Sequence, residues 1–294
     1  MTRHSERGSI FKSQKFMDFP TMKESLIARE IEATFMVAPL AMKLAADGVP
    51  VKIVYLGHRD GTVIMVGKDS AIRDFEDLRG KKMAIPSRFS NQHLLVRRMM
   101  KERGVKPGEI ELLEMPPPDM PSALAADAID AYIVGEPHGA RAEIGGWGRV
   151  LYYTKDIWPN FISCVLVVRQ ELIDEQRELV QELVDGIAGS GEWLDEDPEH
   201  RMDAAVVAGK VFFNQDPELL KFVLSRPPDR VKYVDLKPNR PNFDEIMDLA
   251  VEMDVIQRRM RYEEYVDESF APDLEKVKMP LERLPMPTPG DDHP

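Results

Sequence analysis

The sequence predicts an α/β protein built on a parallel sheet, and the stretch from Gly80 to Arg141 carries this prediction. Short apolar runs that suit buried strands alternate there with segments that suit helices. Apolar residues recur with a helical period from Leu94 to Met100, and Gly104 is a typical helix stop. Strands that alternate with helices predict parallel pairing and right-handed crossovers. The predicted strands are residues 82–85, 110–115 and 131–134.

The segments before this stretch predict a second group of strands and helices. Residues 15–19 fit a strand, and the following PTMKESLIAR fits a helix with Thr21 as its N-cap and Glu24 as a capping-box partner. Apolar runs bounded by glycine, proline and aspartate then predict further strands. These further elements are strands at 31–37, 51–56 and 62–66 and a helix at 40–46.

The segments after Arg141 predict two more strands and then a mostly helical C-terminal part. Pro227 and Pro228 interrupt the helical pattern. Residues 1–14 are polar and expected to be frayed, and the proline-rich tail from about residue 279 predicts disorder. The strands are expected at 150–153 and 164–168, and the helices at 176–187, 201–208, 216–224 and 243–253.

Composition limits the classes of function that fit. A chain of 294 residues can bury one large core or two ordinary ones. The net charge of −12 argues against a nucleic-acid partner, because no basic patch is available to neutralise phosphates. The single cysteine, Cys164, excludes an internal disulfide, and its apolar strand favours a packed thiol over a nucleophile. No apolar run approaches the 18 or so residues of a transmembrane helix.

Three segments of the sequence resemble one protein family. They are GKKMAIP, PPPDMPSALAADAIDAYIVGEPHGAR and TKDIWPN, and they occur in this order at sensible spacing. Together they resemble the substrate-binding proteins of bacterial ABC transporters in the nitrate, sulfonate and bicarbonate class (NMT1/THI5-like). The nitrate and bicarbonate branch is most similar, through its PPP-x-M turn and its GEP strand end. The likeness extends from about Phe16 to Phe270.

The resemblance implies a two-lobed type II periplasmic-binding-protein fold with parallel-rich sheets and a hinge of two crossing strands. The first lobe is then discontinuous, with residues 1–62 and 163–294, and the second lobe is residues 63–162. Measured against the family pattern, the chain starts after the usual first strand and helix. The first lobe is therefore expected to be incomplete, with an unpaired sheet edge and weak ligand affinity.

Polar residues at a predicted strand-to-helix turn are the best candidates for a ligand site. They are Ser87, Arg88, Phe89, Ser90 and Asn91. Ligands of parallel sheets bind outside the carboxyl ends of the strands. Unpaired N–H groups at a helix start suit a carboxylate, sulfonate, nitrate or bicarbonate. The alternative is that Ser90 or Asn91 only caps the helix.

Glu136 and His138 follow the next predicted strand and are expected to face the same crevice. Glu136 can accept a hydrogen bond from a ligand or from the neighbouring turn, and His138 can donate one. A lone histidine is more often a structural residue. The resemblance implies a large aromatic residue at position 138, so the histidine is a departure from the family pattern.

Four further candidates come from the predicted crossings and the first lobe. Arg59 suits an oxyanion fork, with a surface pair with Asp60 as the alternative. Trp158 is either an aromatic wall over the ligand or a residue that packs under the hinge. Asn160 is a polar candidate beside it, and Pro39 is expected to face the cleft from the first lobe.

The leading interpretation is a monomeric protein that captures a small anion or polar organic molecule and delivers it to ABC permease subunits. No cofactor is indicated, and no compact carboxylate cluster indicates a metal, although calcium accompanies bicarbonate in some family members. Binding then favours a closed state by hinge motion. The resemblance implies a periplasmic location, but MTRHSERGSIFKSQKF has no apolar leader, so the sequence as it stands predicts a cytoplasmic one.

Two other functions remain open at this stage. The first is an enzyme on the same scaffold, of the thiamin-pyrimidine or desulfination type. Relatives of the desulfination type need a cysteine in the first lobe, and Cys164 is badly placed for that role. Relatives of the pyrimidine type carry a cysteine-rich motif that is absent from this sequence. The second is a cytosolic ligand sensor, which the N-terminal sequence suggests.

Overall fold

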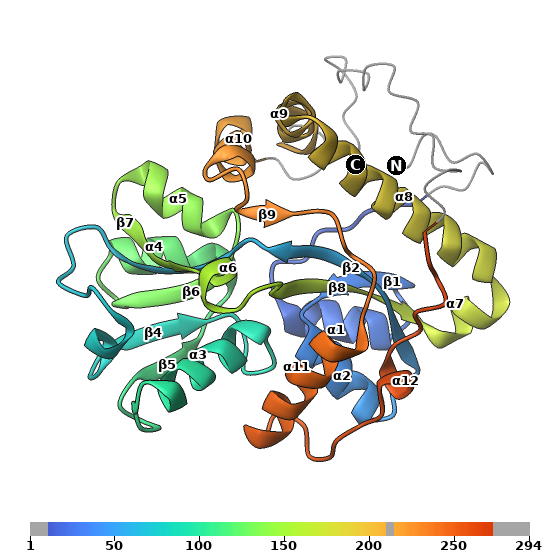
Figure 1. Cartoon of the computed structure of the whole chain (residues 1–294), viewed down its shortest axis with the longest axis horizontal. Helices are drawn as coiled ribbons and strands as arrows, with labels where there is room; N and C mark the ends of the chain where they lie inside the picture. Colours follow the sequence, from blue (N-terminus) through green and yellow to red (C-terminus); the bar gives the residue numbers. More distant parts are fainter. Residues whose placement is uncertain (1–10, 210–214, 273–294) are drawn as a thin grey trace.

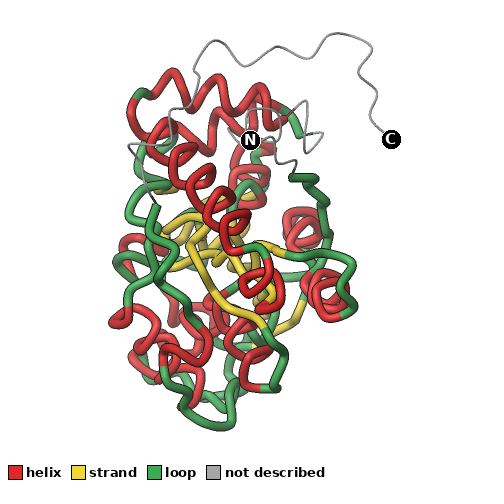
Figure 2. Tube along the Cα trace, turned by 90° about the vertical axis from the view of Figure 1, so that its right-hand side faces the viewer, coloured by secondary structure: helices red, strands yellow, loops and turns green. Residues whose placement is uncertain are grey.

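Two sheets organise residues 11–209 and 215–272, the parts of the chain that the computed structural model describes (Figure 1). Figure 2 shows the strands in the centre of the molecule with helices around them. The first sheet has the order β1-β8-β2-β9, and the second has the order β5-β4-β6-β3-β7. The strands are β1 (Ala33–Met36), β2 (Val51–Asp60), β3 (Thr62–Gly67), β4 (Lys82–Ile85), β5 (Glu111–Glu114), β6 (Ala131–Gly135), β7 (Gly148–Tyr153), β8 (Ile162–Arg169) and β9 (Val231–Lys232).

Helices flank both sheets. We call the part of the chain built on the first sheet the first lobe, and the part built on the second sheet the second lobe. No helix within the described ranges has the length and apolar character needed to cross a membrane. The helices are α1 (Phe19–Ile27), α2 (Ala38–Ala46), η1 (Phe75–Leu78), α3 (Asn91–Glu102), η2 (Pro117–Asp119), α4 (Met120–Ala125), α5 (His138–Gly145), α6 (Thr154–Ile157), α7 (Gln170–Glu175), α8 (Arg177–Glu196), α9 (Pro198–Val207), α10 (Pro217–Ser225), α11 (Arg240–Glu252) and α12 (Tyr262–Tyr265).

The predicted alternation of parallel strands and helices is confirmed in the second lobe. β4 pairs in parallel with β5, with Ile85 opposite Glu114, and in parallel with β6, with Ala84 opposite Tyr132. The segments that follow β4 and β6 therefore leave the sheet at the same edge. This edge is where ligands of parallel sheets bind.

The first sheet differs from the predicted parallel-rich arrangement, because its neighbouring strands are antiparallel. β8 pairs antiparallel with both β1 and β2, and β9 pairs antiparallel with β2. The direction of β8 explains the difference. The chain leaves this sheet along β2 and returns to it along β8, so these two strands run in opposite directions.

The N-terminal prediction is partly wrong. Residues 15–18 form neither strand nor helix, and α1 begins at Phe19. Asp18, not Thr21, is the N-cap, and its carboxylate accepts a hydrogen bond from the Thr21 N–H at 2.8 Å. Pro20 favours this result because its fixed φ suits the first turn of a helix. The expectations for residues 1–10 and for the tail from 279 lie outside the described residues.

Three segments meet where the chain crosses between the lobes. Asp60 and Gly61 have φ of 58° and 68°, which turns the chain sharply from β2 into β3. The Asp60 N–H donates to the Phe161 carbonyl at 2.9 Å, and the Gly61 N–H donates to the Arg230 carbonyl at 2.8 Å. The Thr154 hydroxyl donates to the Thr62 carbonyl at 2.9 Å. The two crossings and the segment before β9 are thus hydrogen-bonded to one another.

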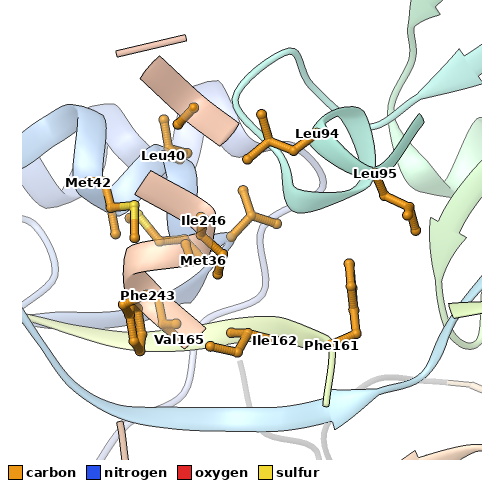
Figure 3. Packing of buried hydrophobic residues seen from close by; sticks show 14 of the residues in the cluster. Met36, Leu40, Met42, Leu94, Leu95, Phe161, Ile162, Val165, Phe243 and Ile246 are labelled. Carbon is orange, nitrogen blue, oxygen red and sulfur yellow. The ribbon is translucent and has the colours of Figure 1, made fainter. Parts of the chain in front are cut away.

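One hydrophobic cluster continues from the first lobe into α3 of the second lobe. In Figure 3, the Leu94 side chain of α3 points toward the side on which Leu40 lies. The Phe161 side chain points from the crossing segment toward Leu95. α11 packs against both α2 and α3, and Ile246 of α11 belongs to the same cluster. The start of α3 therefore lies at a tightly packed junction between the lobes.

The helix α10 lies across the predicted division of the chain. The prediction places residues 163–294 in the first lobe, but α10 packs against α5 of the second lobe. Leu219 and Val223 of α10 share a small apolar cluster with Ala140 of α5. The C-terminal part of the chain thus contributes to both lobes.

Candidate functional site

The start of α3 follows directly from the end of β4. Pro86 ends the strand, and the Ser87 hydroxyl then accepts a hydrogen bond from the Phe89 N–H at 3.1 Å. Ser90 is the N-cap of α3, because its hydroxyl oxygen accepts from the His93 N–H at 3.1 Å. The same hydroxyl donates to the Ser87 carbonyl at 2.6 Å. Ser87 and Ser90 therefore fix the turn, and the helix can start in a buried place.

Two backbone donors remain unused at this helix start. Among the described residues, the backbone N–H groups of Asn91 and Gln92, the first two positions of α3, make no hydrogen bond to another backbone group. Both residues are buried, with exposed fractions of 1% and 3%. Unpaired N–H groups and the positive end of the helix dipole together favour an electronegative ligand atom.

The side chains of these two residues reach toward the crossing segments. The Asn91 amide nitrogen donates to the Ile162 carbonyl, and the Gln92 amide nitrogen donates to the Thr62 hydroxyl at 3.3 Å. The amide oxygens Oδ1 of Asn91 and Oε1 of Gln92 are buried and have no partner among the described residues. Gln92 is not among the sequence candidates. Its place in the first turn after the N-cap is the signal that could have identified it.

His138 begins α5 at the same edge of the sheet. Its carbonyl accepts a hydrogen bond from the Tyr132 hydroxyl at 3.1 Å, and its buried Nδ1 has no partner within the described part of the chain. Burial lowers the pKa of His138 to about 4, and the positive charges of Arg141 and Lys15 act in the same direction. The imidazole is therefore neutral near pH 7, so it can donate or accept one hydrogen bond.

Glu136 has a structural partner instead of facing the ligand position. Its Oε1 accepts from Nε of Arg230 at 2.7 Å, and its Oε2 accepts from the Ala140 N–H at 2.9 Å. Both side chains of the ion pair are buried, with exposed fractions of 4% for Glu136 and 1% for Arg230. Of the two interpretations in the sequence analysis, the contact with the neighbouring turn is the one observed. The sequence gives no sign of Arg230, because 94 positions separate the two residues.

Arg59 is also held by protein groups. Its Nε donates to the Asp235 carbonyl at 2.8 Å, and one terminal nitrogen donates to the Asn160 carbonyl at 2.9 Å. The same terminal nitrogen donates to Oδ1 of Asn242 at 3.2 Å, so two of the three guanidinium nitrogens already have protein acceptors. Asn160 has a φ of 61° and an exposed side chain. Its contact with Arg59 is made by the main-chain carbonyl.

Trp158 is buried at the junction, with 6% of its surface exposed. Its indole N–H donates to Glu245 of α11 at 3.2 Å, and the Arg98 guanidinium lies 4.3 Å from the ring centroid. The Phe161 ring packs against it at 5.5 Å. Of the two predicted roles, packing at the hinge is the one that the contacts support.

The remaining candidates lie around the helix start. Arg88 is exposed, and its Nε pairs with Glu114 at the end of β5 at 2.8 Å. Phe89 is half-buried and packs against the large hydrophobic cluster. Pro39 is buried in the first turn of α2, directly after β1. The structure thus brings Ser87–Asn91 and His138 to one sheet edge and leaves Arg59, Trp158 and Asn160 at the crossings.

The arrangement offers hydrogen bonds and apolar contact to a ligand. Burial raises the pKa of the Cys164 thiol to about 11, so the thiol is protonated near pH 7. Across residues 11–209 and 215–272, no group of three or more histidine, cysteine or acidic side chains is arranged to hold a metal ion.

The two sheets, their crossing strands and the helix start at the junction define a type II periplasmic-binding-protein fold. The chain belongs to the NMT1-like family, whose model matches residues 5–209. Among solved structures, it is similar to a ligand-binding component of an ABC-type import system from Staphylococcus aureus, determined with zinc bound. That similarity has 28% identity and a TM-score of 0.78, and it covers 90% of this chain and 86% of that one.

Curated relatives match a part of the chain. The nitrate import ATP-binding protein NrtC of Synechocystis sp. is 30% identical over 193 residues, which are 60% of this chain and 29% of that protein. The taurine-binding periplasmic protein of Escherichia coli is 26% identical over 188 residues, which are 60% of this chain and 55% of that protein. The matches thus span less than two thirds of these relatives. The desulfurization enzyme DszB shares the fold, with 14% identity, a TM-score of 0.58, and coverage of 81% and 83%.

Proposed function

We propose that this protein is the solute-binding component of an ABC importer. It binds a small anion or polar organic molecule between its two lobes and delivers it to the permease subunits at the outer face of the cytoplasmic membrane. The observation that carries the proposal is the buried start of α3, where the N–H groups of Asn91 and Gln92 make no hydrogen bond to another backbone group within the described residues. Family membership and the nitrate- and taurine-related names of the relatives support it.

In this proposal, the ligand places an oxygen atom against the α3 N–H groups. We propose that Ser87 and His138, which follow the neighbouring parallel strands β4 and β6, contact it from the second lobe, and that α2 with Pro39 contacts it from the first lobe. The unpaired side-chain atoms at the junction are enclosed by protein, so the lobes must move apart for a ligand to enter. A hinge at Gly61 and at residues 158–161 allows this motion.

We infer that binding is the whole function and that the chain catalyses no reaction. The Cys164 thiol lies in β8, and its raised pKa keeps it protonated near pH 7, which makes it a poor nucleophile. Arg59 already donates hydrogen bonds to the carbonyls of Asp235 and Asn160 and to Oδ1 of Asn242. The same proposal places the protein in the periplasm and describes it as a monomer.

Calorimetric titration tests the proposal with nitrate, bicarbonate, taurine, methanesulfonate and a pyrimidine. We expect one of them to bind. Gln92→Leu removes the buried, unpartnered Oε1 at the start of α3, so it should weaken that binding at least tenfold. Lys101→Ala is the matched control, because Lys101 is exposed on the last turn of the same helix. Small-angle scattering of the wild type should report a more compact particle with the ligand bound.

Two results would contradict this function. If the wild type binds none of the ligands and converts one of them to a product, an enzyme on the same fold is the better description. If Gln92→Leu and Lys101→Ala bind the ligand equally well, the start of α3 is not the binding site.

A further inference from the structure

We propose that the ligand of this site must donate a hydrogen bond, and that Asn91 is the residue that selects for the donor. This inference rests on the proposed function and adds a chemical class to it. The class comprises small molecules with an acceptor atom next to an N–H or O–H group, such as primary amides, sulfonamides and ureides. Ions that can only accept, such as nitrate and sulfonate, fall outside it.

The orientation of the Asn91 amide is the first step of the argument. Its nitrogen faces the carbonyl of Ile162, and a main-chain carbonyl can only accept a hydrogen bond. The amide group therefore cannot be turned over without placing two oxygen atoms against each other. Its oxygen Oδ1 is consequently fixed as an acceptor on the other side.

The environment of this oxygen is the second step. Oδ1 of Asn91 is buried and has no partner among the described residues, in a side chain with only 1% of its surface exposed. A buried acceptor without a donor is costly, so it is rarely retained unless a further group pairs with it. A ligand that donates a hydrogen bond at this position would satisfy it.

Gln92 differs from Asn91 in this respect. Its amide nitrogen faces the hydroxyl of Thr62, and a hydroxyl can either donate or accept. The Gln92 amide can therefore adopt either orientation and adapt to the ligand. Asn91 is the acceptor that cannot adapt.

The donors of the same helix start complete the pattern. The backbone N–H groups of Asn91 and Gln92 require an acceptor atom, while Oδ1 of Asn91, in the same turn, requires a donor. Both arginines that were candidates for anion binding already have protein partners. Arg59 is held by carbonyls, and Arg88 is exposed and paired with Glu114. A neutral ligand with an adjacent acceptor and donor satisfies all of these groups.

Matched pairs of probes test this selection by calorimetric titration of the full chain. Methanesulfonamide is compared with methanesulfonate, and acetamide with acetate, because each pair has a similar shape and differs in the donor. We expect the wild type to bind the amide member of each pair at least about tenfold more tightly. Asn91→Leu should remove this preference, and Lys101→Ala should keep it.

The outcomes separate the inference from the function on which it rests. Equal or tighter binding of methanesulfonate, acetate or nitrate by the wild type overturns the inference and leaves the transport function standing. If Asn91→Leu still prefers the amides, Asn91 is not the residue that selects for a hydrogen-bond donor. If Asn91→Leu does not fold, Asn91→Ala takes its place, because it removes the same amide oxygen and should lose the same preference. Failure of the wild type to bind any probe, nitrate and taurine included, refutes the proposed function itself.

Discussion

At the residue scale, buried charged groups decide which candidates are available to a ligand. Glu136 directly follows β6, and Arg59 is the second-last residue of β2, so a ligand contact is a reasonable expectation for both. Each is instead satisfied by a group from the C-terminal part of the chain, namely Arg230 for Glu136 and the Asp235 carbonyl for Arg59. Such partners hold the lobes and the crossings in place.

The ion pair between Arg230 and Glu136 predicts a large loss of stability when one partner is removed. In Arg230→Met, the buried carboxylate of Glu136 and the partly buried carboxylate of Glu143 lose their cation, because Arg230 contacts both. We expect the free energy of unfolding to fall by about 3–5 kcal/mol. Urea unfolding at constant pH measures the change.

The control for this prediction is Arg259→Met. Arg259 pairs with Asp244 in a partly exposed position, so this change should cost less than about 1 kcal/mol. Similar losses for the two variants would show that the buried pair has no special role.

Buried histidines predict a loss of stability in acid. Burial lowers the pKa of His58 from its ordinary value of 6.5 to about 4. Because the unfolded chain binds the proton more readily, the stability due to neutral His58 is complete above pH 6.5 and is lost as the pH falls toward 4. The full effect is on the order of 3 kcal/mol. Thermal unfolding between pH 7 and pH 4 should therefore depend less on pH in His58→Gln, and an unchanged slope would contradict the assignment.

At the element scale, α3 combines three roles that its sequence pattern shows only in part. Ser90 caps the helix, the unpaired N–H groups of Asn91 and Gln92 form the candidate site, and Leu94 and Leu95 join the shared core. The far turns bind α11 through Arg98 and Glu245. Motion of the lobes must therefore either carry α11 along or break these contacts.

The turn between β2 and β3 predicts that any side chain at position 61 lowers the stability of the protein. Gly61 has a φ of 68°, and a Cβ atom there would lie 3.0 Å from Val231 Cγ2 and 3.4 Å from the His58 ring. Gly61→Ala should therefore destabilise the protein by more than about 1 kcal/mol, from backbone strain together with crowding. Urea unfolding provides the measurement.

Gly48→Ala isolates the backbone contribution. Gly48 has a φ of 83°, but a Cβ atom there would have no neighbour within 4 Å. If Gly61→Ala costs no more than Gly48→Ala, the close packing of the crossing against β9 is not important for stability.

At the scale of the whole molecule, the shared core predicts that the lobes unfold together. The same hydrophobic cluster includes Ile53 of the first sheet, Ile133 of the second sheet and Leu95 of α3. Removing one lobe would expose apolar surface on the other, so partial unfolding is unfavourable.

The three tryptophans of the chain allow a direct test. Trp147 lies in the second lobe, Trp158 at the junction, and Trp193 in α8 on the first lobe. Variants that retain one tryptophan each, with phenylalanine at the other two positions, should show the same urea midpoint by fluorescence. Separate midpoints for the Trp147 and Trp193 reporters would show that the lobes unfold independently.

Much of the fold follows from local patterns in the sequence. The apolar runs and helical periods between residues 80 and 141 indicate β4, α3, β5 and β6, because each of these elements is specified by neighbouring residues. Ser90 is identifiable as a cap for the same reason. The family and its fold follow from the three segments that resemble it. The strand predicted at 15–19 fails because Pro20 and Asp18 favour a helix start.

The tertiary structure alone decided the direction of the first sheet and the partners of the candidate site residues. β8 runs against β2 because the chain returns from the second lobe, which no local pattern records. Arg230 reaches Glu136, and Ile162 orients the Asn91 amide, across 94 and 71 positions of sequence. A sequence shows which side chains can form hydrogen bonds, but only the folded chain determines which of them are already satisfied and which remain for a ligand.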